Sequence, residues 1–180
     1  MYESFYQLSR KPFRLSPDPD FFYGSRAHRR AMSYLRYGLS KGEGFIIITG
    51  MVGTGKTTLV KNLFAELDTQ KLVAAQLTNT QLNPDELVGA VCAAFGLAID
   101  GLSKADLLSR LEEFLVNTHS SGKRALLVVD EAQNLPLQAL EELRMLSNFQ
   151  RQEISLLQSF ILGQAEFRDI LVVPELEQLR

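Results

Sequence analysis

The sequence predicts an α/β domain in which a mainly parallel β-sheet lies between two layers of helices. Short apolar runs rich in β-branched residues, such as 45–49, alternate along the chain with longer segments of helical periodicity. The run at 45–49 is apolar and β-branched, which is typical of a central parallel strand. A length of 180 residues suits one such domain with a sizeable core.

Strands and helices can be assigned in order along the chain. The predicted strands are 45–49, 72–77, 126–129 and 156–162. The predicted helices are 25–40, 56 to about 67, 83–95, a segment capped by Ser103, 137–149, and two short pieces at 165–171 and 174–180. The helix start at Asn83 is supported by Pro84 in the first turn and by Glu86 three residues after the cap.

A glycine-rich loop follows the first predicted strand and precedes a helix, and it matches the P-loop pattern G-x-x-x-x-G-K-[ST] in full. Glycines let such a loop turn its N–H groups toward phosphates, and the helix N-terminus adds a positive dipole end. Lys56 is expected to reach the β- and γ-phosphates, and the Thr57 hydroxyl to bind Mg²⁺. The predicted ATP-binding residues are Gly50, Met51, Val52, Gly53, Thr54, Gly55, Lys56, Thr57 and Thr58.

Two acids, Asp130 and Glu131, come directly after the apolar strand at 126–129. Ligands of open α/β sheets bind at the carboxyl ends of the strands, so we expect both acids to face the P-loop. Asp130 is the expected second protein ligand of Mg²⁺, directly or through a water. Glu131 is the expected base that polarises the attacking water. Gln164, after the strand at 156–162, is a weaker candidate for contact with the γ-phosphate or that water.

The first 24 residues differ in composition from residues 25–180. Prolines at positions 12, 17 and 19 exclude a regular helix there, and the seven aromatic side chains require burial. We therefore expect an extended N-terminal arm across the surface of the 25–180 domain. Two interpretations stay open: the arm covers the core, or it borders the nucleotide base or a neighbouring subunit.

Composition excludes several classes of protein. Cys92 is the single cysteine, and its apolar neighbours predict a small buried side chain. No apolar run is long enough to span a bilayer and no signal peptide begins the chain, so we expect a cytoplasmic protein that touches a membrane only through a partner. A net charge of −2 and a pI near 5.7 argue against a domain built to coat nucleic acid.

The helix at 25–40 is nevertheless basic, and this can reflect either a solvated face or a contact with phosphate or nucleic acid. Its basic side chains are Arg26, His28, Arg29, Arg30 and Arg36. His28 alone does not indicate a metal site, because no second His or Cys lies at the spacing that metal ligands require.

With these motifs the chain resembles the AAA+ branch of P-loop ATPases, and within it the general secretion pathway protein A family and the ATPases of exosortase and exopolysaccharide systems. The resemblance lies in the opening residues 1–6, the proline-rich segment 12–19 and the segments 34–39, 130–135, 140–149 and 162–164. It implies a three-layer sandwich with a five-stranded sheet, hydrolysis of ATP, and ring-like homo-oligomers. It also implies a protein partner in a secretion or polysaccharide export system, in the cytoplasm or peripherally at the inner membrane.

The same resemblance assigns Lys56, Thr57, Asp130, Glu131 and Gln164 to the Walker A, Walker B and neighbouring roles of the family. Met51 and Ala165 depart from the family pattern, where an acid and a proline are common. The family continues beyond residue 180 with a further arginine and a helical lid domain, so we expect the lid to be absent or truncated here.

Four other functions are compatible with parts of the sequence. A DNA-associated ATPase of the transposition type and a nucleotide switch that does not hydrolyse ATP stay open as alternatives. A GTPase is disfavoured because the chain has no Asn-Lys-x-Asp guanine-binding motif. A two-domain helicase is disfavoured because 180 residues cannot hold a second motor domain.

Overall fold

The computed structural model describes residues 2–8, 23–42, 44–68 and 70–172. Their main feature is a parallel sheet in the order β1-β6-β3-β2, in which each strand is joined to its neighbour by backbone hydrogen bonds. Its strands are β1 (Phe45–Thr49), β2 (Leu72–Leu77), β3 (Arg124–Val129) and β6 (Leu157–Gly163). All four correspond to predicted strands. The described residues hold four strands of this sheet, one fewer than the five that the resemblance implies.

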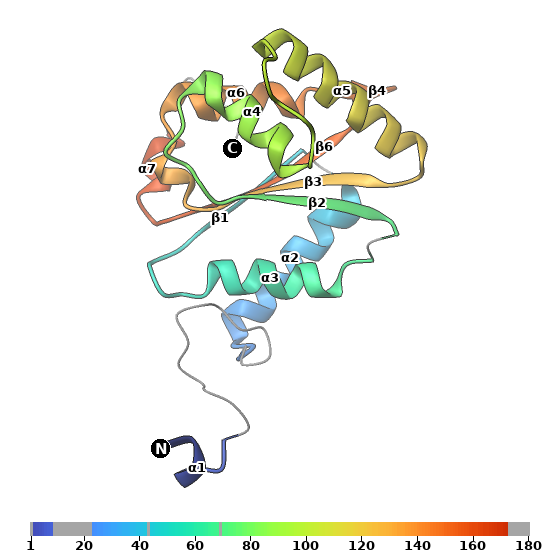
Figure 1. The fold of residues 1–180 in the computed structure, drawn as a ribbon. Coiled ribbons are helices and arrows are strands. Elements are labelled where there is room, and N and C mark those ends of the chain that lie inside the picture. The colour runs from blue at the N-terminus through green and yellow to red at the C-terminus, as the bar shows by residue number, and fades with distance from the viewer. Residues whose placement is uncertain (1, 9–22, 43, 69, 173–180) are drawn as a thin grey trace.

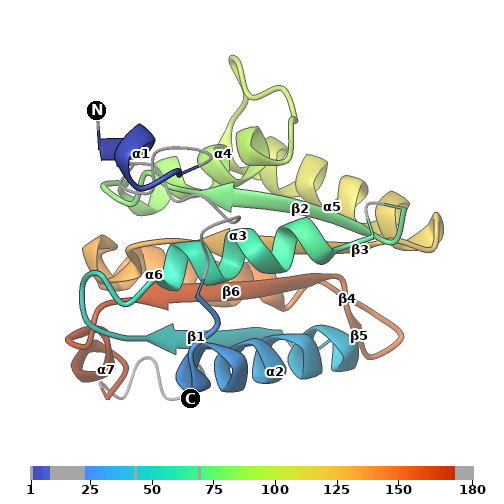
Figure 2. The ribbon, with the colours of Figure 1, turned by 90° about the horizontal axis from the view of Figure 1, so that it is seen from below.

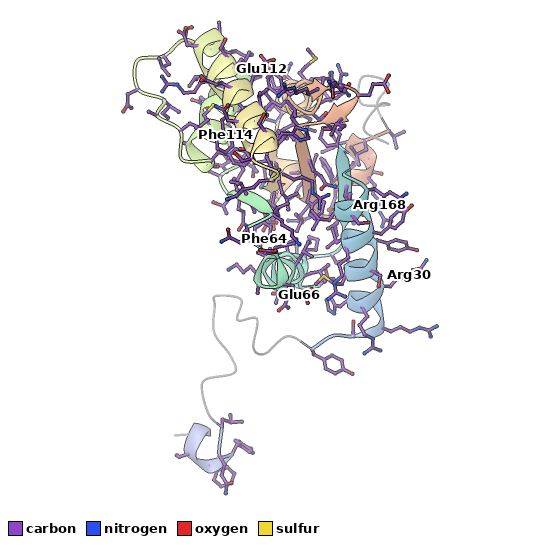
Figure 3. The ribbon with its side chains drawn as sticks, turned by 90° about the vertical axis from the view of Figure 1, so that its right-hand side faces the viewer. Arg30, Phe64, Glu66, Glu112, Phe114 and Arg168 are labelled. Carbon is purple, nitrogen blue, oxygen red and sulfur yellow. The ribbon has the colours of Figure 1, made fainter. Side chains whose placement is uncertain are left out.

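Helices cover both faces of the sheet, as the prediction of an α/β sandwich requires (Figure 1). One layer holds α2 (Arg26–Lys41) and α3 (Lys56–Glu66). The other holds α4 (Pro84–Ala94), α5 (Lys104–Ser120) and α6 (Leu137–Ser147). Figure 3 shows the layers from the side, with Phe64 of α3 and Phe114 of α5 on opposite sides of the sheet.

Each layer packs its own apolar core against the sheet. Beneath α4, α5 and α6 lies a cluster that includes Leu87, Leu111 and Leu140, and beneath α2 and α3 lies a second cluster that includes Leu35 and Leu63. Residues of β3 alternate between the two clusters, because successive side chains of a strand point to opposite faces. The strand is thus buried on both sides, which explains its uninterrupted apolar sequence.

Helix starts follow the predicted chemistry. The Asn83 side chain accepts a hydrogen bond from the Glu86 N–H at 2.9 Å, and Glu86 accepts one from the Asn83 N–H at 3.0 Å. Ser103 caps α5 in the same reciprocal way with Asp106. Each arrangement satisfies backbone donors that have no partner inside the helix.

Short elements were missed by the sequence analysis. They are the one-turn helices α1 (Tyr2–Phe5) and η2 (Ala132–Asn134), and a hairpin of β4 (Gln150–Arg151) with β5 (Ile154–Ser155). The predicted helix at 165–171 shrinks to α7 (Phe167–Ile170). Elements this short carry too few residues to show a period.

Some of the predictions for the two ends of the chain fall on residues outside the described ranges. The prolines of the arm and the predicted helix at 174–180 lie outside the described residues. The expectation that the aromatic side chains of the arm are buried is wrong for three of them, because Phe5, Tyr6 and Tyr23 are 78%, 67% and 83% exposed. Cys92 is buried as predicted, and burial raises the pKa of its thiol. Among the described residues, no helix combines the length and the apolar character that crossing a membrane requires.

Candidate functional site

The carboxyl ends of the strands bring the predicted site residues to one edge of the sheet. Strand register pairs Thr49 with Gly163 and Val129 with Ile161, so the residues after β1, β3 and β6 emerge side by side. The arrowheads of the strands point to the same end, where the loop from β1 to α3 begins (Figure 2). The topology therefore assembles segments that lie far apart in the sequence.

Backbone geometry shapes the loop between β1 and α3. Gly53 and Gly55 have φ values of +77° and +81°, in the left-handed region that a Cβ atom disfavours. The loop is anchored where the Gly50 N–H donates to the Gly163 carbonyl at 3.2 Å, and it is closed where the Thr54 hydroxyl donates to the Met51 carbonyl at 2.8 Å. The Met51 side chain is 72% exposed, so its backbone and not its side chain serves the loop.

Lys56 begins α3 and folds back over this loop. Its Nζ donates to the carbonyls of Gly50 at 2.9 Å and Met51 at 3.1 Å. Such an arrangement favours the binding of phosphate, because the lysine ammonium, the N–H groups of the loop and the positive end of the helix dipole lie together.

Thr57 and Asp130 meet across the site. The Thr57 hydroxyl donates to Asp130 Oδ2 at 2.7 Å, and Asp130 is only 7% exposed. Hydroxyl and carboxylate oxygens are ligands that Mg²⁺ prefers when it also binds phosphates and water. In the part of the chain that the structure describes, no cluster of three His, Cys, Asp or Glu side chains forms a metal site made of protein groups alone.

Glu131 follows Asp130 in a strained backbone conformation with a φ of +52°. Its carbonyl accepts a hydrogen bond from the buried Thr80 hydroxyl at 3.2 Å. Its carboxylate Oε2 accepts one from Gln164 Nε2 at 3.0 Å and one from Gln133 Nε2 at 2.6 Å. The hydrogen bond from Gln164 has the largest effect on the pKa of Glu131, and together with that from Gln133 it holds this pKa below its usual value. Burial acts in the opposite direction and raises the pKa, while the charge of Lys56 lowers it further.

Gln133 was not singled out from the sequence as a site residue. It lies in η2 and links the other two groups, because its Oε1 accepts from the Gln164 N–H at 2.9 Å while its Nε2 donates to Glu131. The only signal available was its place in the segment 130–135, two residues after Glu131. We call Asp130, Glu131, Gln133 and Gln164 the acid–amide cluster.

Gly163 places Gln164 at the end of β6. A Cβ atom at position 163 would lie 2.7 Å from the Cβ of the buried Phe167, closer than such atoms approach. The glycine therefore lets α7 pack directly over the end of the strand.

One cavity joins the loop to the acid–amide cluster. It measures about 250 Å³, and its lining residues are Val52, Gly53, Gly55, Lys56, Thr57, Thr58 and Glu131. Six of the predicted loop residues and Glu131 thus share one cavity, and Asp130 is joined to it through its hydrogen bond with Thr57. A larger groove of about 740 Å³ is lined by residues of α2 and β1 together with Arg168, and none of the predicted catalytic residues lines it.

Comparisons with known proteins show the family to which the chain belongs. The family model described as AAA domain matches residues 39–171. General secretion pathway protein A of Aeromonas hydrophila is 41% identical over 99% of this chain and 33% of its own length. The Mu-like prophage FluMu DNA transposition protein B of Haemophilus influenzae is 32% identical over 55% of this chain and 32% of its own. The matched segment therefore spans about a third of the length of either relative.

Among solved structures, the ORC2 protein of Aeropyrum pernix matches with a TM-score of 0.64. The match covers 93% of this chain and 48% of that protein, at 17% sequence identity. Identity at this level supports the fold alone.

Proposed function

Because this chain belongs to the AAA domain family, we propose that it binds Mg-ATP at the P-loop and hydrolyses it to ADP and phosphate. The observation that carries the proposal is the convergence of Lys56, Thr57 and Glu131 on one cavity. A glycine turn without function would not account for a lysine above the loop and two acids opposite it.

In the proposed binding mode, phosphate oxygens replace the loop carbonyls as partners of Lys56 Nζ. Loop N–H groups and the first turn of α3 add donors and a favourable dipole. Thr57 Oγ1 and Asp130 would hold Mg²⁺, whose bound charge stabilises the charge that develops on the phosphates.

In the proposed hydrolysis step, Glu131 acts as the base. Both described amide contacts fall on its Oε2, so Oε1 is left for a water. The water oxygen attacks the γ-phosphorus, the bond from that phosphorus to the bridging oxygen breaks, and the water proton passes to Glu131. Gln133 and Gln164 would keep the carboxylate in place during this step.

We further propose that hydrolysis serves an envelope secretion or polysaccharide export system through a protein partner. The support is the 41% identity with general secretion pathway protein A over nearly the whole chain. Ring-like homo-oligomers, with a neighbour completing the site, are part of the same proposal.

A DNA-associated ATPase is the second candidate, and α2 is the observation that favours it. Its basic side chains are Arg26, Arg29, Arg30, Arg36 and Lys41, and the helix carries no acid. Arg36 is paired with Glu66 at 2.6 Å, which reduces the charge available to phosphates. Retarded migration of duplex DNA that weakens steeply with salt would support this candidate.

The proposed function is tested by measuring Mg-ATP binding and phosphate release together, over a range of protein concentrations. We expect saturable binding and a rate per subunit that rises with concentration if neighbouring subunits complete the site. Absence of Mg-ATP binding at millimolar nucleotide would overturn the proposal. Binding without phosphate release at any concentration would favour the nucleotide switch.

A further inference from the structure

His28 reaches the P-loop from another part of the chain. It lies in the first turn of α2, and its Nε2 is 2.8 Å from the Thr54 carbonyl oxygen. Its Nδ1 is 2.8 Å from the hydroxyl of Ser25, the N-cap residue of the same helix. Both ring nitrogens are thus engaged, one with the helix start and one with the loop.

The chemistry of the partners fixes the direction of these hydrogen bonds. A carbonyl oxygen can only accept, so Nε2 carries a proton and donates to Thr54. The Ser25 hydroxyl can then donate to Nδ1 while its oxygen accepts the His28 N–H at 3.3 Å. Ser25 therefore caps α2 and orients the imidazole ring with a single hydroxyl group.

The Thr54–Gly55 peptide is the part of the loop that His28 restrains. Because a trans peptide is planar, its C=O and N–H point in opposite directions. The structure describes no cis peptide bond, so a Thr54 carbonyl turned toward His28 turns the Gly55 N–H away from it. Gly55 itself lines the cavity that Lys56, Thr57 and Glu131 share, so an N–H turned away from His28 is available to a phosphate bound there.

Close packing reinforces the restraint. A Cβ atom on Gly55 would lie 3.2 Å from His28 Nε2, so the ring sits directly against the loop. Other described hydrogen bonds hold the first half of the loop, where the Thr54 N–H and hydroxyl both donate to Met51. The described partner of the Thr54 carbonyl is His28.

We propose that His28 is a positioning residue for nucleotide binding, which holds the Gly55 N–H toward the phosphates and is itself oriented by Ser25. The proposal rests on the proposed function, since it assigns this loop a phosphate ligand. Without the imidazole, the Thr54–Gly55 peptide is free to rotate, and the loop must be ordered again each time nucleotide binds.

The test compares His28→Phe, which keeps a ring but loses the donor, with His28→Gln, whose Nε2 can still donate to a carbonyl. Mg-ATP affinity is measured by calorimetry, and thermal unfolding is followed without nucleotide. We expect His28→Phe to weaken Mg-ATP binding by roughly 5- to 20-fold, with an unchanged unfolding temperature, and His28→Gln to recover most of the affinity. His119→Phe, in the opposite helical layer, is the matched control and should bind like the wild type.

The outcomes separate this inference from the proposed function. If the wild type binds Mg-ATP, Lys56→Ala does not, and His28→Phe binds as tightly as the wild type, the role of His28 is refuted while the function stands. If the wild type fails to bind, the proposed function itself is refuted. A parallel fall in affinity and unfolding temperature for both His28 variants would assign the residue to folding and also refute the positioning role.

Discussion

The P-loop and Glu131 of the acid–amide cluster line one cavity, but the loop is held through its backbone carbonyls and glycine conformations, whereas Glu131 is held mainly through its own carboxylate. Residues 50–55 owe their shape to glycines with positive φ and to hydrogen bonds onto loop carbonyls. Glu131 is held instead by two glutamine amides and by a hydroxyl on its own carbonyl. Mg-ATP binding should therefore depend on the loop and on the groups that hold its carbonyls. Turnover should fall further with each of the two glutamine amides that is removed from Glu131.

Lys56→Ala should have the largest effect, because it removes the ammonium group from the loop. We expect loss of measurable Mg-ATP binding and of turnover, with the fold retained. Calorimetry and circular dichroism check both points. Lys61→Ala on the same helix is the control, and tight binding by the Lys56 variant would contradict the role of the loop.

Glu131→Gln should separate the two regions most clearly. The amide keeps the size of the side chain but cannot take the water proton, so Mg-ATP binding should persist while turnover falls by about 10²-fold or more. Phosphate release under saturating ATP measures the loss. Glu166→Gln, on an exposed position nearby, should behave like the wild type, and full activity of the Glu131 variant would remove that residue from the mechanism.

Gln164→Leu should lower turnover less, by roughly 10-fold, because Gln133 still holds the carboxylate. It should also change the pH dependence. The hydrogen bond from Gln164 lowers the pKa of Glu131, so its loss raises that pKa and moves the acidic limb of the rate profile to higher pH. A pH–rate profile that keeps its acidic limb in place would show that Gln164 does not act through Glu131.

Gly163→Ala should have the smallest effect on turnover and act mainly through packing. The added methyl meets Phe167, and overpacking of this kind costs about 1–3 kcal/mol of unfolding free energy. Urea unfolding measures the cost, and Gly44→Ala is the control, because a Cβ atom there would meet only Ser147 Cβ at an ordinary 3.9 Å. If the Gly163 variant is as stable as the wild type, Phe167 and α7 can move to accept the added methyl group, and the close packing does not contribute to stability.

The sequence predicted the strands and the P-loop because each depends on a local pattern. An uninterrupted apolar run marks β3, and glycines at fixed spacing mark the loop between β1 and α3. Asp130 and Glu131 followed from topology, since parallel strands end at a common edge. Their contacts with Thr57 and Gln164 agree with that expectation.

Residues that act through tertiary contacts were harder to predict. Gln133 lies in one turn of 3₁₀-helix, and no sequence pattern shows that its amide bridges Glu131 and Gln164. His28 appeared only as part of a basic helix, because its contact with Thr54 spans 26 positions of the chain. The hairpin of β4 and β5 was missed because each strand has only two residues.

Helix α2 is held closely against the sheet at Gly38. A Cβ atom there would overlap Ile46 Cδ1, and the Gln158 amide donates to the Gly38 carbonyl at 2.9 Å. His28 lies ten positions earlier on the same helix, roughly 15 Å away at a rise of about 1.5 Å per residue. A tilt of α2 about this contact would displace His28 more than the residues beside Gly38, so we expect a substitution at Gly38 to alter the hydrogen bond between His28 and the Thr54 carbonyl.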